Sequence, residues 1–216
     1  MTILALEFSS AQRSVALARS GRVLAEASET GGRETHAFGM IEKVMASANI
    51  GRAEIECLAL GLGPGSYTGI RVSLSIAQGW QLATGVKLLG IGSADCLAAQ
   101  AQAEKIFTRV NVVIDAQRGE FYLATFEVSA DGAREIVPLK IVSTSEIKSL
   151  AAAGEILVGP EATSQFPSGK VIFPQAAMLA TLAAQRTDFM AGEKLEPIYL
   201  RETNFVKAPP ARTMAA

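Results

Sequence analysis

The first third of the chain begins with short apolar runs separated by polar or turn-forming residues. Residues 3–8, 13–19 and 22–28 are each short enough and apolar enough to be strands rather than helices. Ser20-Gly21 is a turn-forming pair between the second and third runs. The pattern predicts an antiparallel meander of three strands.

Helix-like spacing and further strands follow this meander. Apolar residues at three- and four-residue steps form one face of a helix predicted over residues 35–48, with Thr35 as its N-cap: Phe38, Ile41, Met45 and Ala48. Further helices are predicted over 70–84 and 93–103, and strands over 56–62 and 87–91. Strands that alternate with helices favour parallel pairing through right-handed crossovers, so the first hundred residues predict one mixed sheet with helices packed on it.

The second half repeats this order. Its predicted strands are 109–115, 120–128, 134–142, 155–158 and 170–173, and its predicted helices are 145–152 and 175–186. The doubled arrangement resembles the actin, Hsp70 and sugar-kinase superfold, an α/β class in which two lobes, each a mixed sheet with helices, face each other across a cleft. We therefore expect an N-terminal lobe over residues 1–104, a C-terminal lobe over 105–216, and a flexible tail over 203–216.

Composition narrows the possible environments and partners. The chain has 216 residues, of which 49% are hydrophobic and 19% charged, as expected of a well-packed soluble α/β protein. A formal net charge of -1 gives no general attraction to a phosphate backbone, so any RNA would be held mainly by another subunit. Cys57 and Cys96 lie in apolar stretches and predict buried thiols. No apolar run reaches the ~20 residues of a membrane span, and no basic segment precedes an apolar run at the N-terminus, so we expect a cytoplasmic protein.

The glycine-rich segment 63–69 lies between a predicted strand and a predicted helix. Three glycines and a proline allow a tight turn with exposed backbone N–H groups, which suits either an anion or the close approach of another backbone. No Gly-Lys-Ser/Thr follows, so the segment is not a P-loop. Glycine content alone leaves open whether it is more than a turn.

Three motifs, in order along the chain, carry a family resemblance. Residues 63–71 read Gly-Pro-Gly-Ser-Tyr-Thr-Gly-Ile-Arg and are followed by Ile-Ala-Gln-Gly at 76–79. Residues 115–122 read Asp-Ala-Gln-Arg-Gly-Glu-Phe-Tyr, and residues 197–201 read Pro-Ile-Tyr-Leu-Arg. Together they resemble the signature of the TsaB (YeaZ) family over nearly the whole chain.

The resemblance implies a role in tRNA modification. It implies a subunit of the machinery that installs threonylcarbamoyl on adenosine 37 of tRNA, in which TsaD is catalytic, a TsaE ATPase assists, and a TsaB protein binds and supports TsaD. TsaD-like proteins hold a metal with two histidines four residues apart, whereas residues 92–98 here contain none and His36 is the only histidine of the chain. We therefore expect no catalytic residue, metal or cofactor, a TsaD-like and a TsaE-like partner, only indirect contact with tRNA, and no membrane.

An ATPase or ATP-dependent phosphotransferase of the same superfold is the alternative. Such enzymes usually place an Asp at the end of the first strand, followed by a loop of small residues. This chain has Glu7-Phe8-Ser9-Ser10 instead, in which Glu7 remains able to approach a cation and the serines are interpreted as turn residues. Asp115, Arg118 and Glu120 are interpreted as ion-paired loop residues, since no nucleophile or histidine lies nearby in sequence.

A partner surface is predicted on two helices of the first lobe. The helix over 70–84 shows no charge after Arg71, so it is buried either in its own core or against another chain. In the family, this helix and the preceding one are implied to pack against the same pair in TsaD, or against themselves in a homodimer. We therefore expect an isologous homodimer that competes with the heterodimer, with these interface residues: Met40, Val44, Arg71, Ser73, Ser75 and Gln78.

Overall fold

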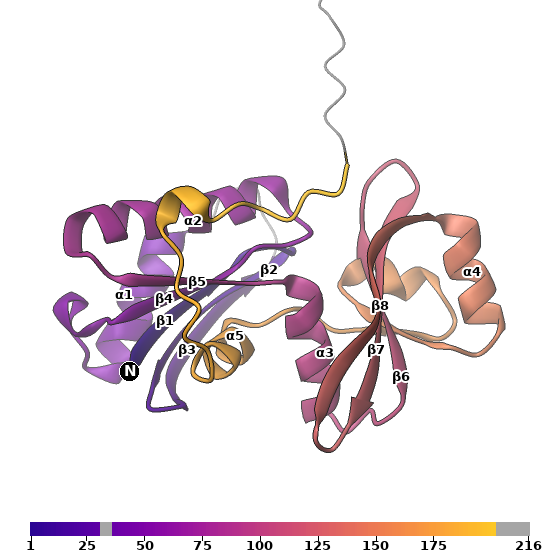
Figure 1. Cartoon of the computed structure of the whole chain (residues 1–216), viewed down its shortest axis with the longest axis horizontal. Helices are drawn as coiled ribbons and strands as arrows, with labels where there is room; N and C mark the ends of the chain where they lie inside the picture. Colours follow the sequence, from indigo (N-terminus) through magenta and orange to yellow (C-terminus); the bar gives the residue numbers. More distant parts are fainter. Residues whose placement is uncertain (31–35, 202–216) are drawn as a thin grey trace, which may run out of the picture.

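Two five-stranded sheets form the frame of the molecule, one in each lobe (Figure 1). The computed structural model describes residues 1–30 and 36–201. The strands of the first sheet are β1 (Thr2–Glu7), β2 (Gln12–Arg19), β3 (Arg22–Thr30), β4 (Cys57–Gly61) and β5 (Lys87–Ile91). Those of the second are β6 (Arg109–Asp115), β7 (Glu120–Ser129), β8 (Gly132–Ser143), β9 (Ile156–Gly159) and β10 (Gly169–Val171).

Both sheets have the same topology. Their strand orders are β3-β2-β1-β4-β5 and β10-β9-β6-β7-β8. In each lobe the first three strands pair antiparallel as a meander, and the last two run parallel to the first strand. The predicted two-lobed α/β fold, with a mixed sheet in each lobe, is confirmed.

Helices cover both faces of the first sheet. The helices of the chain are α1 (Ala37–Ala48), α2 (Tyr67–Thr84), α3 (Ser93–Ala103), α4 (Thr144–Ala152) and α5 (Ala176–Ala183), with short 3₁₀ turns at Arg52–Glu54, Glu161–Gln165 and Gly192–Lys194. Leu4 and Leu6 of β1 pack into a core with α1 and α2, whereas Ile3 and Ala5 pack on the opposite face with α5. Because successive side chains of a strand point to opposite faces, β1 is buried throughout and has a continuous apolar sequence.

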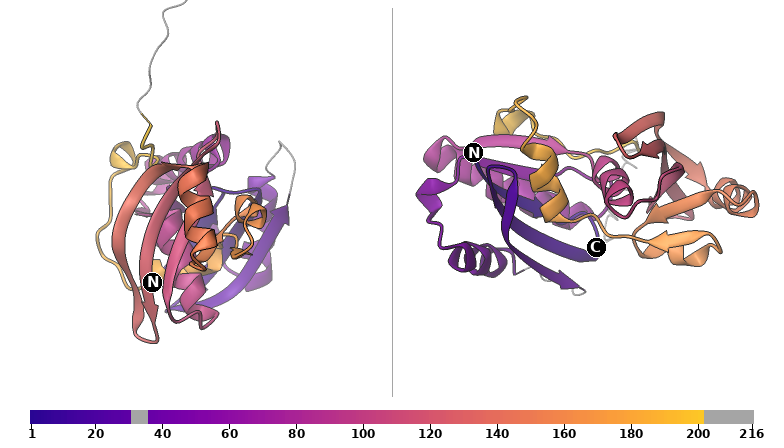
Figure 2. Two further views of the ribbon diagram at one scale, coloured as in Figure 1. Left: turned by 90° about the vertical axis from the view of Figure 1, so that its right-hand side faces the viewer. Right: turned by 90° about the horizontal axis from the view of Figure 1, so that it is seen from below.

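The lobes exchange helices. α3 follows β5 but packs into the core of the second sheet, through Leu97 and Ala101 among others. α5 follows β10 but packs onto the first sheet through Leu179 and Ala183. The view from below shows the α5 ribbon beside the strands of the first sheet (Figure 2). The chain therefore crosses between the lobes before α3 and again before α5, while the division of the chain at residue 104 stays a prediction.

Several helix ends differ from the predicted ones, and α5 in particular spans Ala176–Ala183 rather than 175–186. α2 begins three residues early, at Tyr67, because the Oγ of Ser66 caps it by accepting a hydrogen bond from the N–H of Gly69 at 3.3 Å. α1 begins at Ala37 rather than 35, and its predicted cap, Thr35, lies outside the described residues. The predicted tail over 203–216 also lies outside them. None of the helices in the described part of the chain has the length and apolarity to cross a membrane.

Candidate functional site

The glycine-rich segment is closed against the backbone at the end of β1. A Cβ added at Gly65, whose φ is +148°, would lie 2.0 Å from the carbonyl oxygen of Ser9, and one at Gly69 would lie 1.9 Å from that of Phe8. The N–H of Ser66 donates to the same Ser9 oxygen at 2.6 Å. Of the two uses that the sequence allowed, close approach of a backbone is therefore the one observed, and the backbone belongs to this chain.

Glu7 is fully buried at the end of β1. Its Oε1 accepts a hydrogen bond from the N–H of Ser9 at 2.7 Å, while its Oε2 has no hydrogen-bond partner among the described residues. A Cβ at Gly61 would lie 2.0 Å from that Oε2, so glycine in β4 makes room for the carboxyl. Burial raises the pKa of Glu7, which favours the protonated acid. The carboxyl lies inside the protein with one oxygen bonded to Ser9, and burial disfavours the ionised form that binds cations, so neither feature supports the cation-binding role that the sequence left open.

The hydroxyls of Ser9 and Ser10 are used within the chain. Ser93 donates to the Oγ of Ser9 at 2.8 Å, and Ser10 donates to the carbonyl of Gln12 at 2.7 Å. These bonds support their interpretation as turn residues.

Replacing Glu7 with glutamine should raise the Tm at about pH 8, because burial disfavours the ionised carboxylate and glutamine has no ionised form. A pKa raised above the unfolded value of 4.5 means that the contribution of Glu7 to stability is full below that pH and is lost as pH rises through the folded pKa. Glutamine carries no charge, so the two Tm values should converge near about pH 4. Thermal melts across this range test the expectation, with the exposed Glu26→Gln as control. Parallel curves for the wild type and Glu7→Gln would contradict it.

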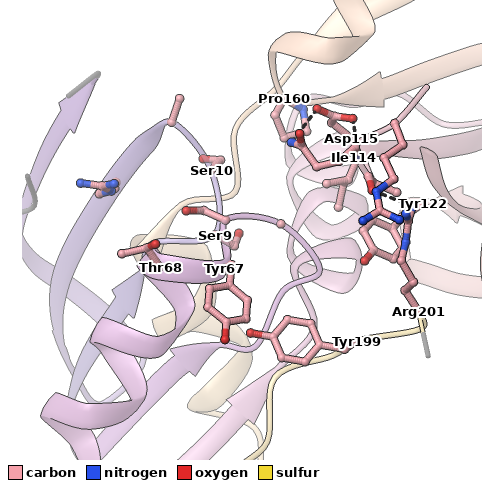
Figure 3. Close-up of a pocket in the computed structure, with 17 residues that line it drawn as sticks. Ser9, Ser10, Tyr67, Thr68, Ile114, Asp115, Tyr122, Pro160, Tyr199 and Arg201 are labelled. Atoms are coloured by element: carbon pink, nitrogen blue, oxygen red, sulfur yellow. Dashed lines mark hydrogen bonds between the residues drawn. The ribbon is translucent and has the colours of Figure 1, made fainter. Parts of the chain in front are cut away.

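A cleft of about 620 Å³ lies between the lobes (Figure 3). The first lobe contributes the end of β1 and the start of α2, the second contributes the turn between β6 and β7, and the C-terminal segment adds two residues. Its polar or aromatic lining includes Ser9, Ser10, Arg13, Ser66, Tyr67, Thr68, Asp115, Gln117, Arg118, Tyr122, Tyr199 and Arg201. Among the described lining residues Asp115 is the one carboxylate, so a pair of acids for proton transfer is not assembled there.

The carboxylates of the second lobe have partners other than the predicted one. Asp115 accepts hydrogen bonds from the backbone and side-chain amides of Gln117, at 2.8 and 3.1 Å. Glu120 accepts from Arg201 at 2.5 Å rather than from Arg118. Both acids have partners within the chain, but they are the end residues of β6 and β7 rather than loop residues. The expected ion pair forms only at Glu120, and its arginine lies 81 positions away in sequence.

An apolar groove runs between α1 and α2 on the outer side of the first lobe. It consists of two adjoining hollows of about 510 and 410 Å³ that share Phe38, Ser75 and Ile76. The remaining lining residues are Ala37, Ile41, Glu42, Arg52, Tyr67, Thr68, Arg71, Val72, Gly79, Trp80, Ala83 and Thr84. Glu42 and Arg52 form an ion pair with each other at 3.3 Å. We call this surface the α1–α2 groove.

The predicted interface residues divide between this groove and the core. Met40, Val44 and Ser73 are 2%, 1% and 0% exposed, so they pack inside the first lobe and present no surface to a partner. The reason is that α1 buries the stripe containing Ala37, Met40, Ile41 and Val44, and leaves Phe38 65% exposed. The sequence grouped Phe38 with Ile41 and Met45 on one helical face and assigned Met40 to the partner surface, whereas the structure exposes Phe38 and buries Met40.

The other three predicted residues reach the surface or its edge. Arg71 and Ser75 are exposed and line the groove. Gln78 is partly buried, and its side-chain amide donates to the carbonyl of Gly192 at 2.9 Å. Sequence reasoning missed Phe38, Ile76, Gly79 and Trp80 as groove residues, although the absence of charge along α2 was the signal that pointed to this face.

Comparison with known proteins gives concordant matches over most of the chain. The family model for TsaD, tRNA N6-adenosine threonylcarbamoyltransferase, matches residues 34–201. The tRNA threonylcarbamoyladenosine biosynthesis protein TsaB of Haemophilus influenzae is 33% identical over 97% of this chain and 98% of its own length. That of Escherichia coli K12 is 28% identical over 98% of this chain and 100% of its own. A Pseudomonas aeruginosa crystal structure, described as an uncharacterized protein with similarity to peptidase YeaZ, has a TM-score of 0.79 and 27% identity, over 93% of this chain and 99% of that one.

Proposed function

We propose that this chain, which belongs to the TsaB (YeaZ) family, is the non-catalytic subunit of a tRNA N6-threonylcarbamoyladenosine synthase. The family places it in tRNA threonylcarbamoyladenosine biosynthesis. In our proposal it binds and supports a TsaD-like catalytic subunit, a TsaE-like ATPase completes the complex, and tRNA is contacted only indirectly. A cytoplasmic location follows from this role.

The α1–α2 groove is the observation that supports the proposal most directly. Exposed apolar surface rimmed by few charges is typical of a protein interface. The TsaD family model matches residues 34–201, a range that includes both α1 and α2, so a TsaD-like partner is expected to present an equivalent pair of helices. Two similar helix pairs pack as a four-helix bundle, and two copies of this chain would form the same bundle as an isologous homodimer.

The alternative reading as an ATPase or phosphotransferase receives no support from the first lobe. Glu7 occupies the position at the end of β1 where such enzymes usually have an Asp, but its carboxyl is buried beside Gly61 and its pKa is raised. Phe8, the next residue, is also fully buried. A peptidase activity, which the description of the Pseudomonas structure mentions, receives no support either. The single histidine of the chain, His36, lies on the surface near Glu29, and one histidine does not make the two-histidine metal site of a metallopeptidase.

Reconstitution tests the proposal. The purified chain alone should neither hydrolyse ATP nor transfer threonylcarbamoyl from threonylcarbamoyl-adenylate to an unmodified tRNA. With the TsaD-like and TsaE-like proteins of the same organism, leaving this chain out should lower the rate of tRNA modification by about tenfold or more. Transfer by the single chain would overturn the proposal, and so would full activity of the mixture without it.

A further inference from the structure

The C-terminal segment is tied along the first lobe before it reaches the second. We call residues 190–201 the strap. The N–H of Met190 donates to the carbonyl of Leu88 at 2.9 Å, and the N–H of Ile198 donates to that of Leu62 at 2.9 Å. Between these points Leu195 is 3% exposed and packs into the core beneath α2. Most of the strap is therefore fixed to the first lobe.

The last residues of the strap cross from α2 to the second lobe. The ring of Tyr199 stacks on that of Tyr67, with centroids 5.7 Å apart, and its hydroxyl accepts from the Nε of Arg71 at 3.4 Å. Two residues later, Arg201 donates to the Oε2 of Glu120 at 2.5 Å and to the carbonyl of Ala116 at 3.0 Å. Figure 3 shows Tyr67, Tyr199 and Arg201 in this sequence across the cleft.

The same residues form the boundary between the cleft and the α1–α2 groove. Tyr67 and Thr68 line both hollows. Arg71 lines the groove, and its guanidinium carbon lies 4.0 Å above the centre of the Tyr67 ring. Arg71 in the groove thus contacts Tyr199 of the strap, the backbone continues from Tyr199 to Arg201, and Arg201 contacts Glu120 of the second lobe.

We propose that the strap is a latch that sets the angle between the lobes. Through the contacts of Arg71 with Tyr67 and Tyr199, the latch also couples that angle to the α1–α2 groove. Two chain crossings join the lobes, at 92–93 and at 172–175, and α3 also packs against α5. In this proposal the lobes rotate about the two crossings. The Arg201 contacts resist such rotation because they join a strap fixed to the first lobe to the β6–β7 turn of the second. The latch is a property of the single chain and does not rest on the proposed function.

The solvent exposure of the Arg201–Glu120 pair determines how strongly it can shift the balance between lobe angles. The side chains of Arg201 and Glu120 are 32% and 45% exposed, so water screens their attraction in part. A pair of this kind shifts an equilibrium by about fivefold, which is enough to change the balance between two lobe angles but too little to control folding.

Spin-label distances between the lobes test the latch. We would introduce Glu26→Cys on β3 and Lys148→Cys on α4, both at exposed positions. The native Cys57 and Cys96 are buried, and burial raises the pKa of Cys57 to about 12, so these thiols should stay unlabelled. The otherwise wild-type chain should give one narrow distance distribution, and Arg201→Ala should broaden or shift it while the Tm changes by less than about 2 °C.

Rescue and a matched control distinguish a latch from a general loss of structure. The double variant Arg201→Glu with Glu120→Arg should narrow the distribution again in part, because it restores the ion pair but not the bond to the carbonyl of Ala116. Arg134→Ala, which removes the exposed 2.6 Å pair with Glu127 inside the second lobe, should leave it unchanged. An unchanged distribution in Arg201→Ala, or the same change in Arg134→Ala, would overturn the latch.

A variant at the groove tests the coupling. Arg71→Ala should shift the distance distribution in the same direction as Arg201→Ala, although the described contacts of Arg71 are with Tyr67 and Tyr199 and not with the second lobe. If only Arg201→Ala had an effect, the coupling would be overturned. Because the measurement uses the isolated chain, its outcome is separate from whether a TsaD-like partner binds.

Discussion

Replacing Gly69 with alanine should lower the Tm by about 10 °C, which corresponds to about 3 kcal/mol of destabilisation in a chain of this size. Gly69 lies in the first turn of α2, where a Cβ would meet the carbonyl oxygen of Phe8 at 1.9 Å. The obstacle is backbone, so no change of side-chain rotamer relieves the clash. α2 and the end of β1 would have to move apart, which would loosen the core between them.

Gly79 provides the matched control in the same helix. Its Cβ would meet nothing within 4 Å, so Gly79→Ala should raise stability slightly, because alanine is favoured over glycine in a helix by about 1 kcal/mol. The two variants make the same chemical change and differ mainly in what the new methyl group meets. Thermal and urea unfolding of both chains measures the difference, and equal stability would contradict the close approach of α2 to β1.

The glycines of the glycine-rich segment have a structural role, because Gly65 and Gly69 lie against the backbone of Ser9 and Phe8. The sequence predicted a tight turn between a strand and a helix, and the structure confirms it. Which backbone the glycines approach was beyond prediction, because Phe8 and Ser9 precede the segment by more than fifty residues. Glycine content reports that space is short near the backbone, but not what occupies that space.

Periodicity predicted the elements of the fold better than their faces. Along α1, the stripe with Phe38, Ile41 and Met45 and the stripe with Met40 and Val44 both have helical spacing, and both are apolar. Only packing on the sheet decides between them, and the structure buries the second together with Ile41 and Met45. Three of the predicted interface residues, Met40, Val44 and Ser73, are therefore buried in the first lobe, while the prediction that α1 and α2 contact a partner stays a proposal.

The exchange of α3 and α5 between the lobes was not predictable for a related reason. A buried helix face indicates that some sheet covers it, and does not identify which sheet. α3 carries alanines and Leu97, and α5 carries alanines and Leu179, so either helix matches either core. The Arg201–Glu120 pair was not predictable from the sequence either, because it depends on the path of the strap across the cleft.

Placing a charge at Gly79 should weaken binding to a TsaD-like partner by about 100-fold or more, because burying an unpaired charge in an interface costs several kcal/mol. Gly79 lines the α1–α2 groove beside Ile76 and Trp80, it is exposed, and its Cβ position is open. Glutamate and arginine are both good helix formers, so Gly79→Glu and Gly79→Arg should fold as well as the wild type. The same variants should convert a homodimer of the isolated chain to monomer.

Titration calorimetry with the TsaD-like protein and the mass in solution by light scattering measure the two effects. Testing both signs of charge guards against a partner that supplies a complementary residue, and Gly79→Ala separates the effect of charge from that of the added methyl group. Full binding by Gly79→Ala with loss in both charged variants would locate the partner on this groove. Binding by all three variants at wild-type strength would mean that the partner docks elsewhere, and the exposed apolar surface around Phe38 would then need another occupant.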